Sequence, residues 1–268
     1  MTHKQILDKL AAKYLVLSID EDLATLTFYA MCYDKHHSID NQLSYILPKI
    51  LLRWNCVLNA DKNISANYKQ KTILALAILL HKYGFADKQI TEKALTAIDD
   101  LNNAVALSDD FFRKADEIKA FINTTPVPLK KKPTTPENIT FYREQDVVAI
   151  QLDGKFYAAY IHKLTGPNES PIIEFYDGTF DKVPALEELD GLNARGQVYN
   201  DGVARVSLYS ISGMKYLPDL ANQIQLISAC VEKKPSNNHL AKSVGLYAMS
   251  DLFEIQDTII KMFNLVKE

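Results

Sequence analysis

The sequence predicts an α+β fold: an all-helical N-terminal domain followed by a mainly antiparallel β domain with a C-terminal helix. Glycine usage is the first of three observations behind this prediction. Of the nine glycines in 268 residues, only Gly84 precedes residue 150. Long helices avoid glycine, whereas turn-rich β structure needs it where φ is positive. The first half of the chain therefore favours helices, and the second half favours strands and turns.

A proline-rich segment and a change of apolar period are the other two observations. Residues 124–136 hold four prolines, four threonines and three lysines, which is typical of an extended, semi-rigid linker. Before this segment apolar residues recur at helical spacing, and after it they follow the patterns of strands. We therefore expect a helical array over 1–123, a linker over 124–136 and the β domain over 137–268.

Six helices are expected in the first domain. Ser18 followed by Glu21 has the form of a capping box, which predicts that the second helix begins there. Pro48 lies inside the third apolar pattern, so we expect a kink or a helix start at that point. The fourth helix is apolar nearly all round over 73–80 and ends at Gly84, which predicts the most buried helix of the domain. The expected helical ranges are 7–15, 18–30, 43–54, 65–83, 87–103 and 108–122.

The second domain opens with a strong hairpin signal. Asp153-Gly154 separates two apolar runs, 147–152 and 155–161, and this dipeptide suits a two-residue turn because both positions need positive φ. The residues that follow predict further strands, one short helical turn and an amphipathic C-terminal helix. These elements are expected at 171–178, 203–211 and 224–231 for the strands, at 183–189 for the turn, and at 250–266 for the helix.

The cysteines and the apolar runs bear on the compartment. Cys32, Cys56 and Cys230 are odd in number, far apart and flanked by apolar residues, so we expect buried thiols in a reducing compartment. The N-terminus has no uninterrupted apolar core of the signal-peptide type. The longest apolar run, 73–80, falls well short of the roughly 20 residues that span a bilayer. We therefore expect a cytoplasmic protein that does not cross a membrane.

Charge is distributed unevenly between the two domains. Residues 1–124 hold 15 basic and 15 acidic residues, whereas 137–268 hold 12 basic and 18 acidic residues, a net charge of −6. An acidic β domain argues against nucleic acid as its ligand, because binding phosphates needs a basic face. The same charge suits a basic protein partner, since complementary charge speeds encounter and selects partners. Ordinary solvated charge that keeps the domain in solution explains the count equally well.

Catalytic and metal-binding motifs are missing from the sequence. It contains no HExxH, no histidine spaced with cysteine as a zinc ligand set, no GxSxG and no GxGxxG. Ser212-Gly213-Met214-Lys215 matches the SxxK pattern, but Gly213 and the preceding strand predict a turn where that motif needs a helix. Residues 191–196 have the glycine spacing of a phosphate loop but lack the Lys-Ser/Thr that must follow. We therefore expect a protein that is not an enzyme and carries no cofactor or metal.

The opening of the second domain carries a family resemblance. Residues 146–161 read Asp-Val-Val-Ala-Ile-Gln-Leu-Asp-Gly-Lys-Phe-Tyr-Ala-Ala-Tyr-Ile, and 172–177 read Ile-Ile-Glu-Phe-Tyr-Asp. This pattern, a hairpin with a preferred turn and then a strand that ends in Tyr-Asp, resembles the immunity protein 26 family of bacterial polymorphic toxin systems. The family usually has a glycine where this chain has Gln145, and the helical half has no counterpart in the resemblance.

The resemblance implies a function in bacterial competition, as in contact-dependent inhibition. It implies a cytoplasmic immunity protein that binds and neutralises a cognate toxin domain delivered by a rival cell. A basic nuclease is one candidate toxin, because an acidic patch can occupy the site meant for phosphates. A non-catalytic adaptor or regulatory protein-binding module is the alternative, and an enzyme with an unrecognised site between the domains is a third hypothesis.

Carboxylates and tyrosines of the second domain are the expected contact residues for this partner. For the carboxylates, ordinary surface charge is the alternative role. For the tyrosines, which are candidate aromatic anchors, the alternative is a place in the core. The nine residues are Asp153, Tyr157, Tyr160, Glu174, Tyr176, Asp177, Glu187, Glu188 and Asp190.

Overall fold

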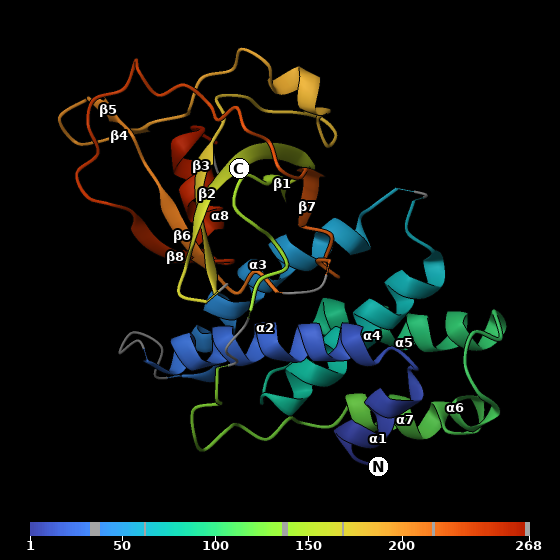
Figure 1. Cartoon of the computed structure of the whole chain (residues 1–268). Helices are drawn as coiled ribbons and strands as arrows, with labels where there is room; N and C mark the ends of the chain where they lie inside the picture. The colour runs from blue at the N-terminus through green and yellow to red at the C-terminus, as the bar shows by residue number, and fades with distance from the viewer. Residues whose placement is uncertain (33–37, 62, 136–138, 168, 216–217, 266–268) are drawn as a thin grey trace. The chain divides into compact units, whose positions relative to one another are not determined.

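The computed structural model describes the chain except for residues 33–37, 62, 136–138, 168, 216–217 and 266–268 (Figure 1). The chain divides into two compact units, which are described separately. The first unit comprises Met1–Leu51 and Val57–Pro136, and the second comprises Leu52–Cys56 and Glu137–Glu268. Helices build the first unit, whereas a mostly antiparallel sheet and a C-terminal helix build the second, so the expected α+β class is confirmed.

Helices form the first unit, and several of them begin at a residue whose side chain caps the helix. The helices of this unit are α1 His3–Lys9, α2 Lys13–Cys32, α3 Ile39–Leu58, α4 Ala66–Lys82, α5 Lys88–Asn103, α6 Asp109–Arg113 and α7 Ala115–Ile122, and five residues of α3 group with the second unit. Ser65 and Asp87 cap α4 and α5, since their side chains accept hydrogen bonds from the N–H groups of Tyr68 and Ile90. Gly84 follows the end of α4 with a φ of +89°, a conformation that favours glycine.

Two helix boundaries in this unit differ from the expectation. The first break falls at Ala11, which has a φ of +47°, and α2 begins at Lys13. Ser18 lies inside α2 and is buried, so the predicted capping box is wrong. Apolar residues keep helical spacing on both sides of Ser18, and this longer pattern overrides the local cap-like sequence. The expected helix over 108–122 is interrupted at Lys114, which separates α6 from α7.

The core of the first unit centres on α4. Ten consecutive residues, 72–81, are buried, which agrees with the prediction of a central helix. Pro48, expected at a kink or a helix start, lies inside α3. The proline-rich segment has no helix or strand over 124–135. It passes close to the end of α4, because a Cβ atom on Gly84 would lie 2.7 Å from the Cα of Pro128.

A six-stranded sheet forms the centre of the second unit (Figure 1). Its elements are β1 Val147–Leu152, β2 Lys155–Thr165, β3 Ser170–Phe175, the 3₁₀ turn η1 Leu186–Leu189, β4 Gln197–Val198, β5 Ala204–Arg205, β6 Tyr209–Ser212, β7 Ile224–Ser228, β8 Ala248–Asp251 and α8 Glu254–Met262. The strand order is β7-β1-β2-β3-β6-β8, and of the strand pairs that the described residues form in this sheet only β6–β8 is parallel. Asp153 and Gly154 turn the β1–β2 hairpin with φ values of +48° and +75°, as the sequence predicts.

The later part of the second unit differs from the expectation in two places. The strand expected over 203–211 is two strands, β5 and β6, which belong to different sheets. The helix expected over 250–266 begins only at Glu254 and ends at Met262, and residue 266 of that range lies outside the described residues. Asp251 ends β8 and sets this start, because its Oδ1 accepts hydrogen bonds from the N–H groups of Phe253 and Glu254 at 2.7 and 2.8 Å.

The two faces of the six-stranded sheet are covered differently. Helix α8 packs Ile255, Ile259 and Met262 into the main cluster of buried apolar residues on one face, which we call the α8 face (Figure 1). The opposite face, which we call the η1 face, is covered by η1 and by irregular chain around Val231. Its smaller buried cluster consists of Val147, Ala158, Tyr160, Tyr176 and Leu189.

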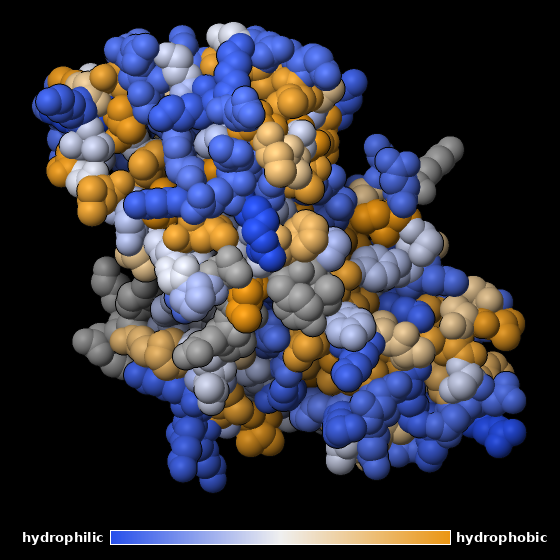
Figure 2. All heavy atoms as spheres, viewed as in Figure 1, coloured by the Kyte–Doolittle hydropathy of each residue, from blue (hydrophilic) through white to orange (hydrophobic). Residues whose placement is uncertain are grey.

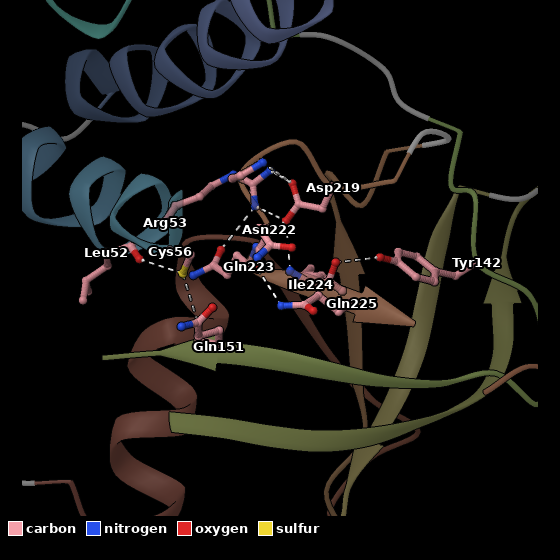
Figure 3. Close-up of polar contacts among 11 residues, drawn as sticks. Leu52, Arg53, Cys56, Tyr142, Gln151, Asp219, Asn222, Gln223, Ile224 and Gln225 are labelled. Atoms are coloured by element: carbon pink, nitrogen blue, oxygen red, sulfur yellow. Dashed lines mark hydrogen bonds and ion pairs between the residues drawn. The ribbon is translucent and has the colours of Figure 1, made fainter. Parts of the chain in front are cut away.

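A buried ion pair fixes the chain that leads into β7 (Figure 3). Arg53 donates from both terminal nitrogens to Asp219, at 3.0 and 2.7 Å, and the two side chains are 1% and 9% exposed. The Asp219 carboxylate also accepts hydrogen bonds from the N–H groups of Ala221, Gln223 and Ile224. A buried pair offsets its desolvation cost only with such additional hydrogen bonds. Both oxygens of the Asp219 carboxylate have internal partners, so we assign the ion pair a structural role.

The cysteines differ from one another in burial. Cys56 is buried, whereas Cys32 and Cys230 are exposed, so the expectation of buried thiols is wrong for two of the three. Cys32 is the last residue of α2, and Cys230 follows β7 with a φ of +57°. Apolar sequence neighbours do not ensure burial where an element ends. None of the helices in the described part of the chain combines the length and the apolar character that a membrane span requires.

Candidate functional site

The η1 face carries a row of polar side chains from two neighbouring strands. Tyr160 of β2 pairs with Glu174 of β3 in the antiparallel register, so both side chains leave the same face of the sheet. Alternation along β3 puts Tyr176 on that face as well. The His162 ring packs edge-on against the Tyr160 ring, with 5.0 Å between their centroids. Strand geometry thus gathers these four side chains.

Glu174 is the most buried member of this row, with no exposed surface. Its Oε2 lies 2.7 Å from Nε2 of His162, and Nδ2 of Asn237 donates to its Oε1 at 3.0 Å. A buried polar group left without a partner costs about 1–3 kcal/mol, and more if it is charged. Because both oxygens have partners, Glu174 organises the row from within and offers no surface that a partner protein can reach.

A cavity of about 250 Å³ lies at the Tyr176 end of the row, and we call it the Tyr176 pocket. Tyr176 is 3% exposed and lines the cavity. Burial raises the pKa of Tyr176 to about 12, helped by the nearby Tyr160, Glu174 and Asp190, so the phenol is neutral at pH 7. The walls of the cavity are apolar and its rim is charged. The wall residues are Leu186, Leu189, Leu192 and Val231, and the rim residues are Glu187, Asp190, Lys233 and Lys234.

Two irregular segments form the walls of the Tyr176 pocket. In the first, the Glu188 side chain accepts a hydrogen bond from the N–H of Ala185 at 2.8 Å, which fixes the start of η1. In the second, the Ser236 carbonyl accepts a hydrogen bond from the N–H of Ala194 at 2.8 Å. These bonds hold the walls in place without a strand or a long helix.

The rim of the pocket has mixed charge. Lys233 donates to Asp190 at 3.1 Å, and the two side chains are 76% and 69% exposed. Glu187 and Lys234 are exposed on the same rim. The acidic excess of residues 137–268 is therefore not concentrated at this site. Figure 2 likewise shows hydrophilic and hydrophobic side chains interleaved on the visible surface of the second unit.

Five of the nine predicted contact residues meet around this pocket, and one more lies beside it. Tyr160 and Glu174 lie in the row behind the cavity, and Tyr176, Glu187 and Asp190 line it. Glu188 belongs to the same turn, where its side chain is used as a cap.

The other three predicted contact residues lie elsewhere in the second unit. Asp153 is exposed in the β1–β2 turn. Tyr157 is fully buried on the α8 face, with its ring centroid 4.6 Å from that of Phe263. Asp177 accepts a hydrogen bond from Arg195 at 2.8 Å, and the same guanidinium donates to the carbonyl of Met262 at the end of α8. In this structure Tyr157 faces the core and Asp177 helps to hold α8.

The sequence-based set lacks several polar residues of the site, among them His162, Asn237, Lys233 and Lys234. Strand alternation could have identified His162, because it lies two residues after Tyr160 on a predicted strand, and the next predicted strand carries Glu174. The other three lie in irregular chain beyond β7, where no apolar period assigns a face to a side chain.

The arrangement suits binding of a side chain. Among the described residues, no group of three or more His, Cys, Asp or Glu side chains could hold a metal ion. Ser212 ends β6 and Gly213 has a φ of +86°, so the SxxK sequence opens on a turn, as expected. Comparison of the chain with protein-family models, with curated proteins and with solved structures gave no match.

Proposed function

We propose that this chain is a cytoplasmic immunity protein that binds and neutralises a cognate toxin domain, and that the Tyr176 pocket is part of the contact surface. One observation carries the proposal: a preformed cavity in the β unit combines a buried tyrosine, apolar walls and a charged rim. Interface hot spots favour such pockets, with an aromatic residue at the centre and near-neutral contacts that exclude water around it. The resemblance of residues 146–177 supports the identity of the partner as a toxin domain.

The size of the cavity supports a protein ligand over a cofactor. Pockets for small molecules and cofactors usually measure about 300–1,000 Å³. At about 250 Å³, the Tyr176 pocket is closer to the volume of one or two side chains. A partner protein would place one side chain there and lay the rest of its contact surface over η1 and the neighbouring chain.

The state of the polar groups supports binding rather than catalysis. Glu174 is committed to His162 and Asn237, and Asp190 is paired with Lys233. The Tyr176 phenol keeps its proton at neutral pH because its pKa is raised to about 12. A general base or nucleophile needs a free group with a pKa near the working pH. A non-catalytic binding protein needs no such free group, so paired carboxylates and a neutral phenol suit it.

Coexpression with the product of the gene immediately upstream tests the proposal. We expect a one-to-one complex and protection of cells that express that product. Glu187→Lys and Asp190→Lys should each weaken the complex by about tenfold or more, because they alter charge at the proposed contact. Glu169→Lys is the matched control, since Glu169 is exposed in the β2–β3 turn at the opposite end of β3 from Tyr176.

The outcomes separate this proposal from its alternatives. If the upstream product neither copurifies with the chain nor loses toxicity, the immunity function is wrong. If the complex forms but Glu187→Lys, Asp190→Lys and Glu169→Lys bind alike, the function stands and the assigned surface is wrong. Capture of a housekeeping complex in place of a toxin would favour a regulatory adaptor.

A further inference from the structure

We infer that two copies of this chain pair in antiparallel orientation through β8, the last strand of the six-stranded sheet. The inference goes beyond the proposed function and uses none of the residues of the Tyr176 pocket. Three observations carry it: an open backbone edge, a run of exposed apolar side chains, and opposite charges at the two ends of that run. We call this stretch, residues 242–251, the β8 edge.

The backbone of the β8 edge is open for pairing. The sheet ends at β8, which has β6 as its neighbour (Figure 1). The N–H of Ala248 donates to the carbonyl of Leu208 at 2.9 Å, so the backbone groups of Ala248 point toward β6. Because successive residues of a strand turn these groups to opposite sides, the N–H and C=O of Met249 point away from β6. Before β8, the backbone groups of 242–247 have no hydrogen-bond partner among the described residues.

The β8 edge also exposes apolar side chains. All residues from 241 to 249 are exposed, and Val244, Leu246 and Met249 are 73%, 85% and 71% exposed. Proteins usually protect an edge strand with lysine, proline or a bulge, but 243–250 contains no charged residue and no proline. At the other end of the sheet, Leu226 is the only exposed large apolar side chain described in β7. The β8 edge is therefore the better template for another strand.

Opposite charges lie at the two ends of the β8 edge. Lys242 is exposed at its start, and Glu254 is exposed just beyond its end, in the first turn of α8. When two copies pair in antiparallel orientation, the start of each edge lies beside the end of the other. Lys242 of one copy then lies near Glu254 of the other, and this happens twice. Parallel pairing would bring like charges together, so the charges favour the antiparallel arrangement.

A second copy meets these requirements better than other occupants do. A helix would contact the edge through its side chains and leave the N–H and C=O of Met249 unpaired. A strand with charged side chains would bury them against 243–250 without partners, which is costly. The β8 edge of another copy offers free backbone groups, uncharged apolar side chains and complementary charges at its ends. A two-fold axis relates the copies in such a dimer, and their two sheets join into one.

The mass of the full chain in solution tests the inference. Light scattering and sedimentation equilibrium should give twice the chain mass of 30.3 kDa, with a Kd of about 1–10 μM. Met249→Pro removes an outward N–H and keeps the bond of Ala248 to β6, because an edge strand tolerates proline where its N–H faces solvent. It should weaken the dimer by about 30-fold, since one hydrogen bond is lost from each copy. Met249→Ala keeps this N–H and should weaken the dimer by no more than about threefold.

Added charge at the two edges of the sheet gives a second comparison that does not depend on the fold of a proline variant. Leu246→Lys places like charges in the uncharged part of the interface and should weaken the dimer by about tenfold or more. Leu226→Lys is the matched control, because it adds the same charge to β7. It should leave the Kd unchanged. Circular dichroism checks that each variant keeps its fold.

Exchange of the end charges gives a result that damage to the fold cannot produce. Lys242→Glu and Glu254→Lys each bring like charges together in their own dimers and should each weaken the dimer by about fivefold. In an equimolar mixture of the two variants, opposite charges meet again at both ends. The mixture should therefore dimerise with a Kd close to that of the unchanged chain.

The outcomes separate this inference from its alternatives. It is overturned if the chain is a monomer at about 100 μM, well above the expected Kd. It is also overturned if Met249→Pro and Leu246→Lys leave the dimer unchanged, or if the mixed charge variants pair no better than each does alone. A monomer whose toxin complex is lost in Met249→Pro would assign the β8 edge to the toxin instead. A dimer without any toxin partner removes only the proposed function.

Discussion

The two faces of the six-stranded sheet in the second unit differ in how many apolar and how many polar side chains they bury. Among the described residues, the α8 face buries a cluster of 17 apolar residues under a helix, whereas the η1 face buries five. The η1 face also carries the polar pair of buried Glu174 and half-buried His162. Apolar burial contributes about 25 cal/mol per Å², so the α8 face holds most of the stability. Residues of the η1 face can therefore be substituted, or can contact a partner, with less effect on the free energy of folding.

The largest effect is expected from a cavity on the α8 face. Ile259 of α8 is fully buried in the main cluster, and Ile259→Ala should lower the free energy of unfolding by about 2–5 kcal/mol. Urea denaturation measures the change. Met249→Ala in β8 is the control, since Met249 is 71% exposed and should change stability by no more than about 0.5 kcal/mol. Equal effects of the two variants would contradict the assignment of the core to the α8 face.

A smaller effect is expected from the buried polar row of the η1 face. Glu174→Ala leaves His162 and Asn237 without their shared partner and should cost about 1–3 kcal/mol. Glu174→Gln keeps the shape and an amide oxygen for Asn237, so we expect a cost nearer 1 kcal/mol. The same urea experiment measures both. A larger loss for Glu174→Ala than for Ile259→Ala would reverse the comparison of the two faces.

The sequence predicted regular elements well and the pocket only in part. The Asp153-Gly154 turn and strand alternation specify the β1–β2 hairpin, and alternation along β3 already places Glu174 and Tyr176 on one face. The apolar run 155–161 likewise predicts the strand that carries Tyr160. The pairing of Tyr160 with Glu174 needs the β2–β3 register, which contains an irregularity between Ile161 and Lys163.

The walls of the pocket escaped prediction for a physical reason. Lys233 and Asn237 lie in chain without helix or strand beyond β7, and tertiary hydrogen bonds such as Ala194 to Ser236 fix their positions. No local period encodes such contacts. The same limit explains the cysteines, because the burial of Cys230 depends on how the chain leaves β7 rather than on its neighbours in sequence.

The smallest effect concerns thiol chemistry and leaves stability unchanged. Cys230 is exposed and directly precedes Val231 of the pocket wall, whereas Cys56 is buried. Burial raises the pKa of Cys56 to about 12, with Asp219 adding to the shift and Arg53 opposing it. At pH 8 only about one Cys56 in ten thousand is then a thiolate, the form that reacts with disulfide reagents.

In a Cys32→Ser variant, we therefore expect one thiol to react rapidly with an aromatic disulfide reagent at pH 8 and a second to react only after denaturation. The absorbance of the released aromatic thiol, read before and after adding urea, counts the rapidly reacting thiols and the thiols that react only after denaturation. Fast reaction of both thiols in the native protein would mean that the chain around Cys56 opens readily.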